Sequence, residues 1–166
     1  RFFARTFQLI TNTANTETLM ISLLLAAAAF TSSPMPTQTY DFRDALDAIR
    51  IVETGGEPNE GIGSRGDGGN ARGPYQIHRI YHVDAAGEDK SLGDYSLTLT
   101  SKSYSERVVR AYMSRYASGA LRRLELGLGS LKDVETIARI HNGGPQGHRK
   151  QATLGYWGKV RRALAS

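Results

Sequence analysis

The chain has 166 residues, a net charge of +5 and no cysteine. This length suffices for one domain whose hydrophobic core needs neither a metal nor a disulfide, and the absence of cysteine excludes a thiol nucleophile and a cysteine-based zinc site. The positive charge suits an anionic partner, whether a bacterial cell wall, a nucleic acid or a membrane surface, and does not choose among them.

The first 39 residues differ in composition from the rest of the chain. Arg1 and Arg5 precede an apolar run at 21–30 that is too short to span a bilayer. Small residues and prolines follow this run. The order is typical of a signal peptide and a linker, so we expect residues 1–39 to direct export and residues 40–166 to form the folded domain. The location would then be secreted or periplasmic, in the cell envelope; the alternative is a disordered N-terminus without a targeting role.

An amphipathic helix is expected to open the folded domain. Asp41 can cap this helix. Apolar residues then recur every three or four positions, at Phe42, Ala45, Leu46, Ile49 and Val52. The Thr-Gly-Gly-Glu-Pro sequence that follows must end the helix. The pattern therefore places Glu53 in the last turn.

A glycine-rich segment at 61–77 follows the helix and contains the chain's strand signals. Asp67 lies in the middle of this segment. Gly61, Gly63 and Gly66 match the dinucleotide-binding pattern G-x-G-x-x-G, but that fingerprint requires a preceding strand, and here a helix precedes. We interpret the glycines as turn residues of one small antiparallel sheet.

The rest of the chain is predicted to be mostly helical. Helical patterns cover residues 76–86, 103–118, 134–141 and 151–164, with a short helix and turn at 121–128 and a polar, irregular stretch at 88–100. Asp133 can cap the helix at 134–141, and Gly143 and Gly144 can end it. The last helix should turn Leu154, Trp157, Val160 and Leu164 inward. Mostly helices with one small sheet indicate an α+β fold.

Glu53 and Asp67 form a candidate pair for glycoside hydrolysis. That reaction needs two carboxyl groups in different environments, one protonated to donate and one ionised. Glu53 follows two apolar residues, a setting that favours its neutral form. Asp67 lies among polar residues and turn N–H groups, which favour a negative charge. From spacing alone, however, an acid at a helix end is more often a solvated or capping residue.

Two further groups of polar residues are weaker candidates. His78 and His82 have the i, i+4 spacing of metal ligands, but the glutamate of the metalloprotease pattern is missing, so we expect surface or hydrogen-bonded histidines rather than a metal site. The segment 141–145, HNGGP, can point polar groups into a cleft or simply form a helix C-cap. The basic residues at 159–162 are more typical of a solvated helix face than of a nucleic-acid site.

Several segments together resemble the invertebrate-type (i-type) lysozymes, in a cysteine-free form. They are, in order, VETGG (52–56), IGSRGD (62–67), GPYQI (73–77), the pair Tyr81 and Asp84, AYMSRYAS (111–118), ARIHNGGPQG (138–147) and TLGYW (153–157). They span about residues 46–160, which is most of the predicted folded domain. The order of the whole set, rather than any one segment, makes the resemblance specific.

The resemblance implies a lysozyme-like α+β fold with the small sheet beside a catalytic cleft. It implies that Glu53 is the general acid and Asp67 the second catalytic carboxylate. The candidate substrate contacts that it implies are Gln76, His78, Tyr81, His141, Asn142 and Gly143. The implied reaction is hydrolysis of the β-1,4 bond between N-acetylmuramic acid and N-acetylglucosamine in peptidoglycan, without a cofactor.

Two departures from the family pattern bear on stability and on activity. Family members are usually rich in disulfides, whereas Ser64, Arg72 and His148 stand about where cysteines would be expected. An isopeptidase activity credited to some members uses serines just after the aspartate, and the corresponding residues here, GGNAR (68–72), contain none. The second activity is therefore not supported.

The sequence thus predicts an exported, monomeric muramidase. Its partner would be peptidoglycan, with no nucleic acid and no stable membrane insertion. Two alternatives remain open at this point: a lytic transglycosylase that uses Glu53 alone, and a non-catalytic module that binds peptidoglycan through the same cleft.

Overall fold

The computed structural model describes residues 38–166, so the predicted signal peptide and linker fall almost entirely outside the described residues. The first helix, α2 (Phe42–Thr54), begins at a reciprocal cap. The Asp41 carboxylate accepts a hydrogen bond from the Asp44 amide at 2.9 Å, and the Asp44 carboxylate accepts one from the Asp41 amide at 2.8 Å. The helix ends at Gly55, whose φ of 64° is left-handed. The predicted helix is confirmed, with Glu53 in its last turn.

The glycine-rich segment forms a small antiparallel sheet, as predicted. Its strands are β1 (Arg65–Gly66), β2 (Ala71–Arg72) and β3 (Ile77–His78), in the order β1-β2-β3. A 3-10 turn (Asp67–Gly69) connects the first two strands. Gly73 lies in the second turn with φ at 69°, and a Cβ there would overlap the Thr98 carbonyl oxygen. Only glycine therefore fits this turn against its neighbour.

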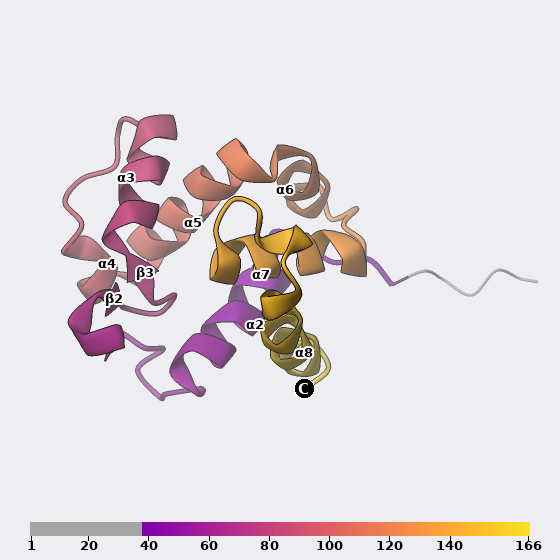
Figure 1. Ribbon diagram of the computed structural model, residues 1–166, viewed down its shortest axis with the longest axis horizontal. Helices are drawn as coiled ribbons and strands as arrows, with labels where there is room; N and C mark the ends of the chain where they lie inside the picture. The colour runs from indigo at the N-terminus through magenta and orange to yellow at the C-terminus, as the bar shows by residue number, and fades with distance from the viewer. Residues whose placement is uncertain (1–37) are drawn as a thin grey trace, which may run out of the picture. The chain divides into compact units, whose positions relative to one another are not determined.

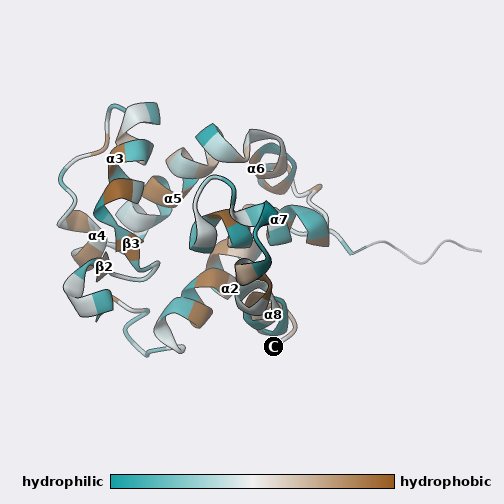
Figure 2. Ribbon diagram, in the orientation of Figure 1, coloured by the Kyte–Doolittle hydropathy of each residue, from teal (hydrophilic) through white to brown (hydrophobic). Residues whose placement is uncertain are grey.

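The remaining helices build the core around α7 (Figure 1). They are α3 (Arg79–Glu88), α4 (Leu97–Thr100), α5 (Lys102–Tyr116), α6 (Ser118–Glu125), α7 (Leu131–Gly143) and α8 (Leu154–Ala163). Helix α7 packs against α2, α5, α6 and α8, and its Val134, Ile137, Ala138 and Ile140 side chains are fully buried. Apolar and hydrophilic stretches alternate along α2 and α3 (Figure 2), as expected of helices with one face in a core. The predicted α+β class is confirmed.

The structure corrects four details of the predicted elements. Helix α3 begins at Arg79 rather than at residue 76, because residues 77 and 78 pair in β3. The stretch at 88–100 contains the short helix α4. Ser130 caps α7, and Asp133 is the reciprocal N3 residue of that cap. Leu154 is 39% exposed rather than buried, because 3-10 turns precede it and α8 starts there.

None of the helices within residues 38–166 is both long and apolar enough to cross a bilayer.

Asp133 is expected to contribute strongly to stability. Its nearly buried carboxylate accepts hydrogen bonds from Arg123, at 2.5 Å from Nη2, and from the Ser130 amide and hydroxyl. These bonds, above all those from Arg123, lower the pKa of Asp133 to about 2. A carboxyl that ionises near 4 in the unfolded chain and near 2 in the folded one contributes about 2 kcal/mol at neutral pH. This contribution is complete above about pH 4 and is lost as the pH falls through about 2.

The Asp133→Asn variant should therefore unfold with a free energy about 2 kcal/mol lower than wild type at pH 7. Urea denaturation at a series of pH values measures this difference, which should narrow below pH 4. Glu125→Gln is the matched control, because the Glu125–Arg110 pair is more exposed and should contribute less than about 1 kcal/mol. Equal losses in the two variants would contradict the prediction.

Candidate active site

Glu53 is held in place by a tyrosine from the far end of the chain. The Glu53 side chain is 18% exposed, and its Oε1 accepts a hydrogen bond of 2.7 Å from the hydroxyl of Tyr156 on α8. Burial, together with the nearby Glu53 carboxylate, raises the pKa of Tyr156 well above its usual value. Tyr156 therefore remains a neutral hydrogen-bond donor to Glu53 at any physiological pH.

His141 stands beside the same carboxyl oxygen. Its Nε2 lies 3.0 Å from the Tyr75 carbonyl oxygen and 3.7 Å from Glu53 Oε1. Its Nδ1 lies 3.2 Å from the hydroxyl of Tyr81. Because a carbonyl can only accept, Nε2 must carry a proton, and in the neutral imidazole Nδ1 then accepts from the Tyr81 hydroxyl.

The imidazole of His141 is neutral in this setting. Burial lowers the pKa of His141, although Glu53 opposes the effect. The contact with Glu53 is therefore not an ion pair. Tyr81 is fixed in turn by stacking on Tyr112, with ring centroids 3.6 Å apart. His141 and its hydrogen-bond partners, Tyr75 and Tyr81, thus form a rigid, uncharged group next to Glu53.

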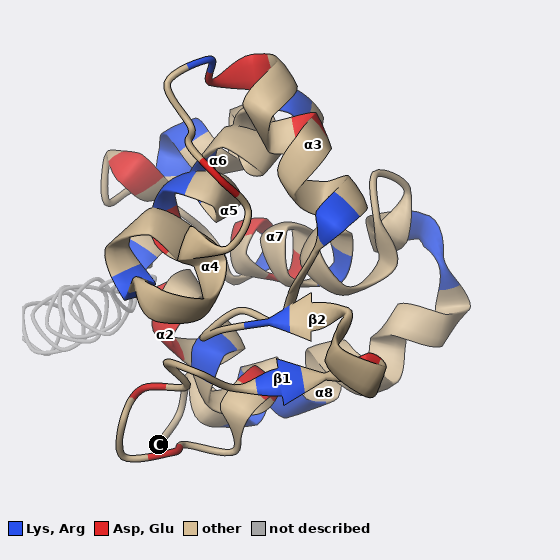
Figure 3. Ribbon diagram, turned by 90° about the vertical axis from the view of Figure 1, so that its left-hand side faces the viewer, with Lys and Arg blue, Asp and Glu red and all other residues tan. Residues whose placement is uncertain are grey.

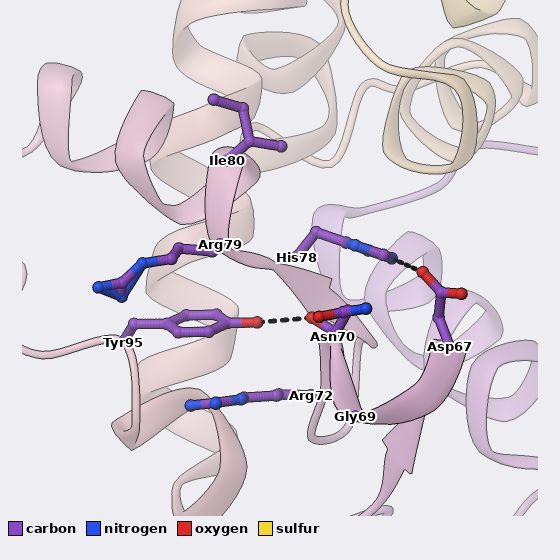
Figure 4. A pocket seen from close by; sticks show the side chains of 8 residues that line it. All are labelled: Asp67, Gly69, Asn70, Arg72, His78, Arg79, Ile80 and Tyr95. Atoms are coloured by element: carbon purple, nitrogen blue, oxygen red, sulfur yellow. Dashed lines mark hydrogen bonds and ion pairs between the residues drawn. The ribbon is translucent and has the colours of Figure 1, made fainter.

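Asp67 lies in a different environment. Its side chain is 70% exposed, and its Oδ2 lies 3.8 Å from Nε2 of His78, which is itself 46% exposed (Figure 4). The backbone of Asp67 has a φ of 48°, in the left-handed region. A non-glycine residue in that region is uncommon, although Asp and Asn tolerate it better than most residues. The turn after β1 therefore directs this carboxylate by an unusual backbone conformation.

Both carboxyl groups line one cleft of about 310 Å³. Its lining residues are Glu53, Asp67, Ala71, Gln76, His78, Tyr81, His141 and Asn142. The structure thus brings together the two candidate acids and five of the six candidate substrate contacts. Gly143 does not line this cleft: its α-carbon faces the Thr153 side chain, and its carbonyl oxygen accepts a hydrogen bond of 2.6 Å from Lys150.

Two further hollows continue the cleft. One, of about 250 Å³, shares His78, Tyr81, His141 and Asn142 with the cleft. The other, of about 480 Å³, shares Asp67 and His78 with it. A row of connected hollows suits an extended polymer better than a small molecule.

His82 does not join the site. Its Nε2 lies 2.8 Å from the Tyr104 hydroxyl in the interior, between α3 and α5. Within residues 38–166, no three histidine or acidic side chains lie close enough together to hold a metal ion.

Sequence reasoning missed Tyr156 as a site residue. The segment TLGYW, which contains it, contributed to the family resemblance, but nothing local indicated a contact with Glu53, 103 positions away. Tyr75 was also missed, because it acts through its backbone carbonyl, which no side-chain pattern reports.

The Tyr156→Phe variant should lower kcat for any reaction that depends on Glu53 by about tenfold, because one hydrogen bond to a charged or reacting group is lost. KM should change less, since Tyr156 does not line the cleft. Steady-state kinetics on a soluble glycan measures both. Tyr104→Phe is the matched control, since it removes the hydroxyl that pairs with His82, away from Glu53. Full activity in Tyr156→Phe would show that this hydrogen bond has no role in the reaction.

The comparisons with known proteins point to one family. The destabilase family model matches residues 44–163. Lysozyme 1 of Crassostrea virginica is 35% identical over 71% of this chain, and the match spans 57% of that relative. Invertebrate-type lysozyme 3 of Caenorhabditis elegans is 33% identical over 74% of this chain and 86% of that relative.

A solved structure agrees with this family. The crystal structure of inhibitor-bound lysozyme from Meretrix lusoria has a TM-score of 0.54 and 29% identity to this chain, covering 74% of this chain and 89% of its own. The motifs, the fold and the relatives agree, and the chain belongs to the destabilase family, among the invertebrate-type lysozymes.

Proposed function

We propose that this chain is a lysozyme that hydrolyses the β-1,4 bond between N-acetylmuramic acid and N-acetylglucosamine in peptidoglycan. The observation that supports this most directly is the cleft that contains Glu53 and Asp67 together. The two carboxyl groups differ as the reaction requires, because one is mostly buried and the other is mostly exposed.

Glu53 is proposed as the general acid. Its Oε1 is occupied by the Tyr156 hydroxyl, which leaves Oε2 to carry the proton. As the glycosidic bond breaks, Glu53 transfers this proton to the leaving oxygen. The neutral imidazole of His141 restricts the position of the Glu53 carboxyl group.

Asp67 is proposed as the second carboxylate. Its exposed position supplies negative charge next to the sugar carbon as the oxocarbenium-like transition state forms. Asp67 either stabilises this centre or attacks it to form a glycosyl-enzyme. Water then completes the reaction, with Glu53 acting as base, and the configuration is retained. Gln76, His78, Tyr81, His141 and Asn142 are proposed sugar contacts along the cleft.

The setting in which the enzyme acts is also a proposal. We propose an exported monomer that works on the cell envelope, where a net charge of +5 would concentrate it on an anionic wall.

Digestion of purified peptidoglycan by the full chain tests the proposed function. We expect new reducing ends, which a reducing-sugar assay detects. Mass spectrometry should show that these ends carry muramic acid in its ordinary reducing form, with the mass of one added water. Anhydro-muramic ends would instead indicate a lytic transglycosylase. Binding to peptidoglycan without any release of fragments would indicate a non-catalytic module.

A further inference from the structure

A hollow with an unusual lining adjoins the catalytic cleft beyond Asp67. We call it the arginine pocket, and it has a volume of about 480 Å³. Its lining residues are Asp67, Gly69, Asn70, Arg72, His78, Arg79, Ile80 and Tyr95. Because Asp67 and His78 also line the cleft, a glycan bound across the two acids would pass next to this pocket. The proposed hydrolysis assigns no task to the arginines.

Two arginines cover both faces of one tyrosine ring. The Arg72 guanidinium carbon lies 4.4 Å from the centre of the Tyr95 ring, and that of Arg79 lies 5.7 Å from it. Figure 4 shows the ring edge-on, with Arg79 on one side and Arg72 on the other. Neither face of the ring is free to stack on a sugar. The tyrosine therefore serves to hold the two cations rather than to bind the ligand directly.

The tyrosine at the centre of this stack is fixed firmly. Tyr95 is 7% exposed, and its hydroxyl lies 2.8 Å from the Asn70 carbonyl oxygen and 2.7 Å from that of Ile77. These contacts connect the turn before α4 to β3 and to the residue that precedes β2. The two guanidinium groups thus stand on a rigid support, which lowers the entropic cost of binding a ligand.

Positive charge exceeds negative charge in the lining of the pocket, which contains Arg72, Arg79 and one carboxylate, Asp67; the Asp94 carboxylate also lies near Arg79. Within residues 38–166, neither Arg72 nor Arg79 forms an ion pair, in contrast to Arg107, Arg110 and Arg123. The Nε of Arg72 is buried without a hydrogen-bond partner. Arg65 adds further charge because it pairs with Arg72 across β1 and β2, whose basic segments lie side by side in Figure 3.

We propose that the arginine pocket binds a carboxylate carried by the muramic acid of the substrate. This inference rests on the proposed function. N-acetylglucosamine is uncharged, whereas muramic acid carries a lactyl group whose carboxyl is either free or extended by a peptide with carboxylates of its own. The planar guanidinium group matches a carboxylate geometrically and binds it through paired hydrogen bonds. The pocket thereby selects muramic-acid glycans over chitin, which has the same β-1,4 linkage but no carboxylate.

Calorimetric binding to the inactive Glu53→Gln variant of the full chain tests this inference. The ligands are a chitin oligosaccharide, a peptide-free muramic-acid oligosaccharide and the same oligosaccharide with its peptides. Adding Arg79→Gln should weaken binding of the carboxylate-bearing ligands about tenfold relative to chitin, as expected for one charge-assisted interaction. Arg79 is exposed, so its replacement should leave the fold intact. Arg122→Gln, an equal charge change on exposed α6, is the matched control and should not alter the ratio.

The outcomes separate the two sources of the carboxylate. Weakening with the peptide-free ligand alone identifies the lactyl carboxylate, because the peptide converts that group into an uncharged amide in the other ligand. Weakening with the peptide-bearing ligand alone identifies a carboxylate of the peptide, and weakening with both shows that the pocket binds either one. If Arg79→Gln left the affinity for muramic-acid ligands relative to chitin unchanged, either because no ligand bound more weakly or because all bound equally more weakly, the inference would be overturned. Whether wild type cleaves peptidoglycan is measured separately, so the proposed function and the role of the pocket can fail independently.

Discussion

The Glu53→Gln variant should lose about a thousandfold in kcat on peptidoglycan. Glutamine has nearly the same shape as glutamic acid, and its Oε1 can still accept the hydrogen bond that Tyr156 donates to Glu53. The amide, however, cannot deliver a proton to the leaving oxygen. Removing the general acid typically costs two to four orders of magnitude. Release of reducing ends measures the loss.

A matched control separates this effect from damage to the helix. Glu88 is also a glutamate at the end of a helix, α3, but it is exposed and lies outside the cleft. Glu88→Gln should therefore keep wild-type activity, and both variants should melt within a few degrees of wild type. If Glu53→Gln kept more than a tenth of the wild-type activity, Glu53 could not be the general acid.

The position of Glu53 could be predicted because its causes are local. The Asp41 cap, the apolar spacing along α2 and the left-handed Gly55 all lie within one short stretch of chain. Each is a standard signal for the start, buried face or end of a helix. The small sheet was predicted for the same reason, since glycines that are close in sequence mark its turns.

The surroundings of Glu53 could not be predicted, because they come from distant parts of the chain. Tyr156 reaches the carboxyl group because α8 packs against α2, and sequence patterns do not report which helices will touch. The inward direction expected for Leu154 was wrong for a related reason: the 3-10 turns before it set the start, and so the rotation, of α8. The spacing of apolar residues predicts which side of a helix is buried only once the first residue of that helix is known.

The arginine pocket illustrates the same limit. From the sequence, Arg72 stands out only because the family resemblance leads to the expectation of a cysteine at about its position, and no pattern points to Arg79 or Tyr95. Their arrangement depends on the strand pairing that places Arg72 below the Tyr95 ring and on the start of α3 that places Arg79 above it (Figure 4). Only the three-dimensional structure joins these three side chains into one group.

The Asp67→Asn variant should reduce kcat on peptidoglycan about a hundredfold, less than the loss expected at Glu53. The change removes the negative charge that stabilises the oxocarbenium-like centre, a kind of electrostatic effect that is worth two to three orders of magnitude. Asparagine suits the test because it tolerates the left-handed backbone that Asp67 adopts at a φ of 48°. Alanine at this position would add strain and confuse loss of charge with loss of structure.

Asp89→Asn is the matched control for Asp67→Asn, because Asp89 is also a carboxylate that faces a basic side chain, Arg107, but it lies outside the cleft. We expect this control to keep wild-type kcat in the same reducing-end assay. Full activity in Asp67→Asn, with anhydro-muramic acid in the products, would contradict the two-carboxylate mechanism and would leave Glu53 as the sole catalytic acid. Loss of activity in Asp67→Asn with hydrated ends in the wild-type products would instead assign to Asp67 the charge that the transition state requires.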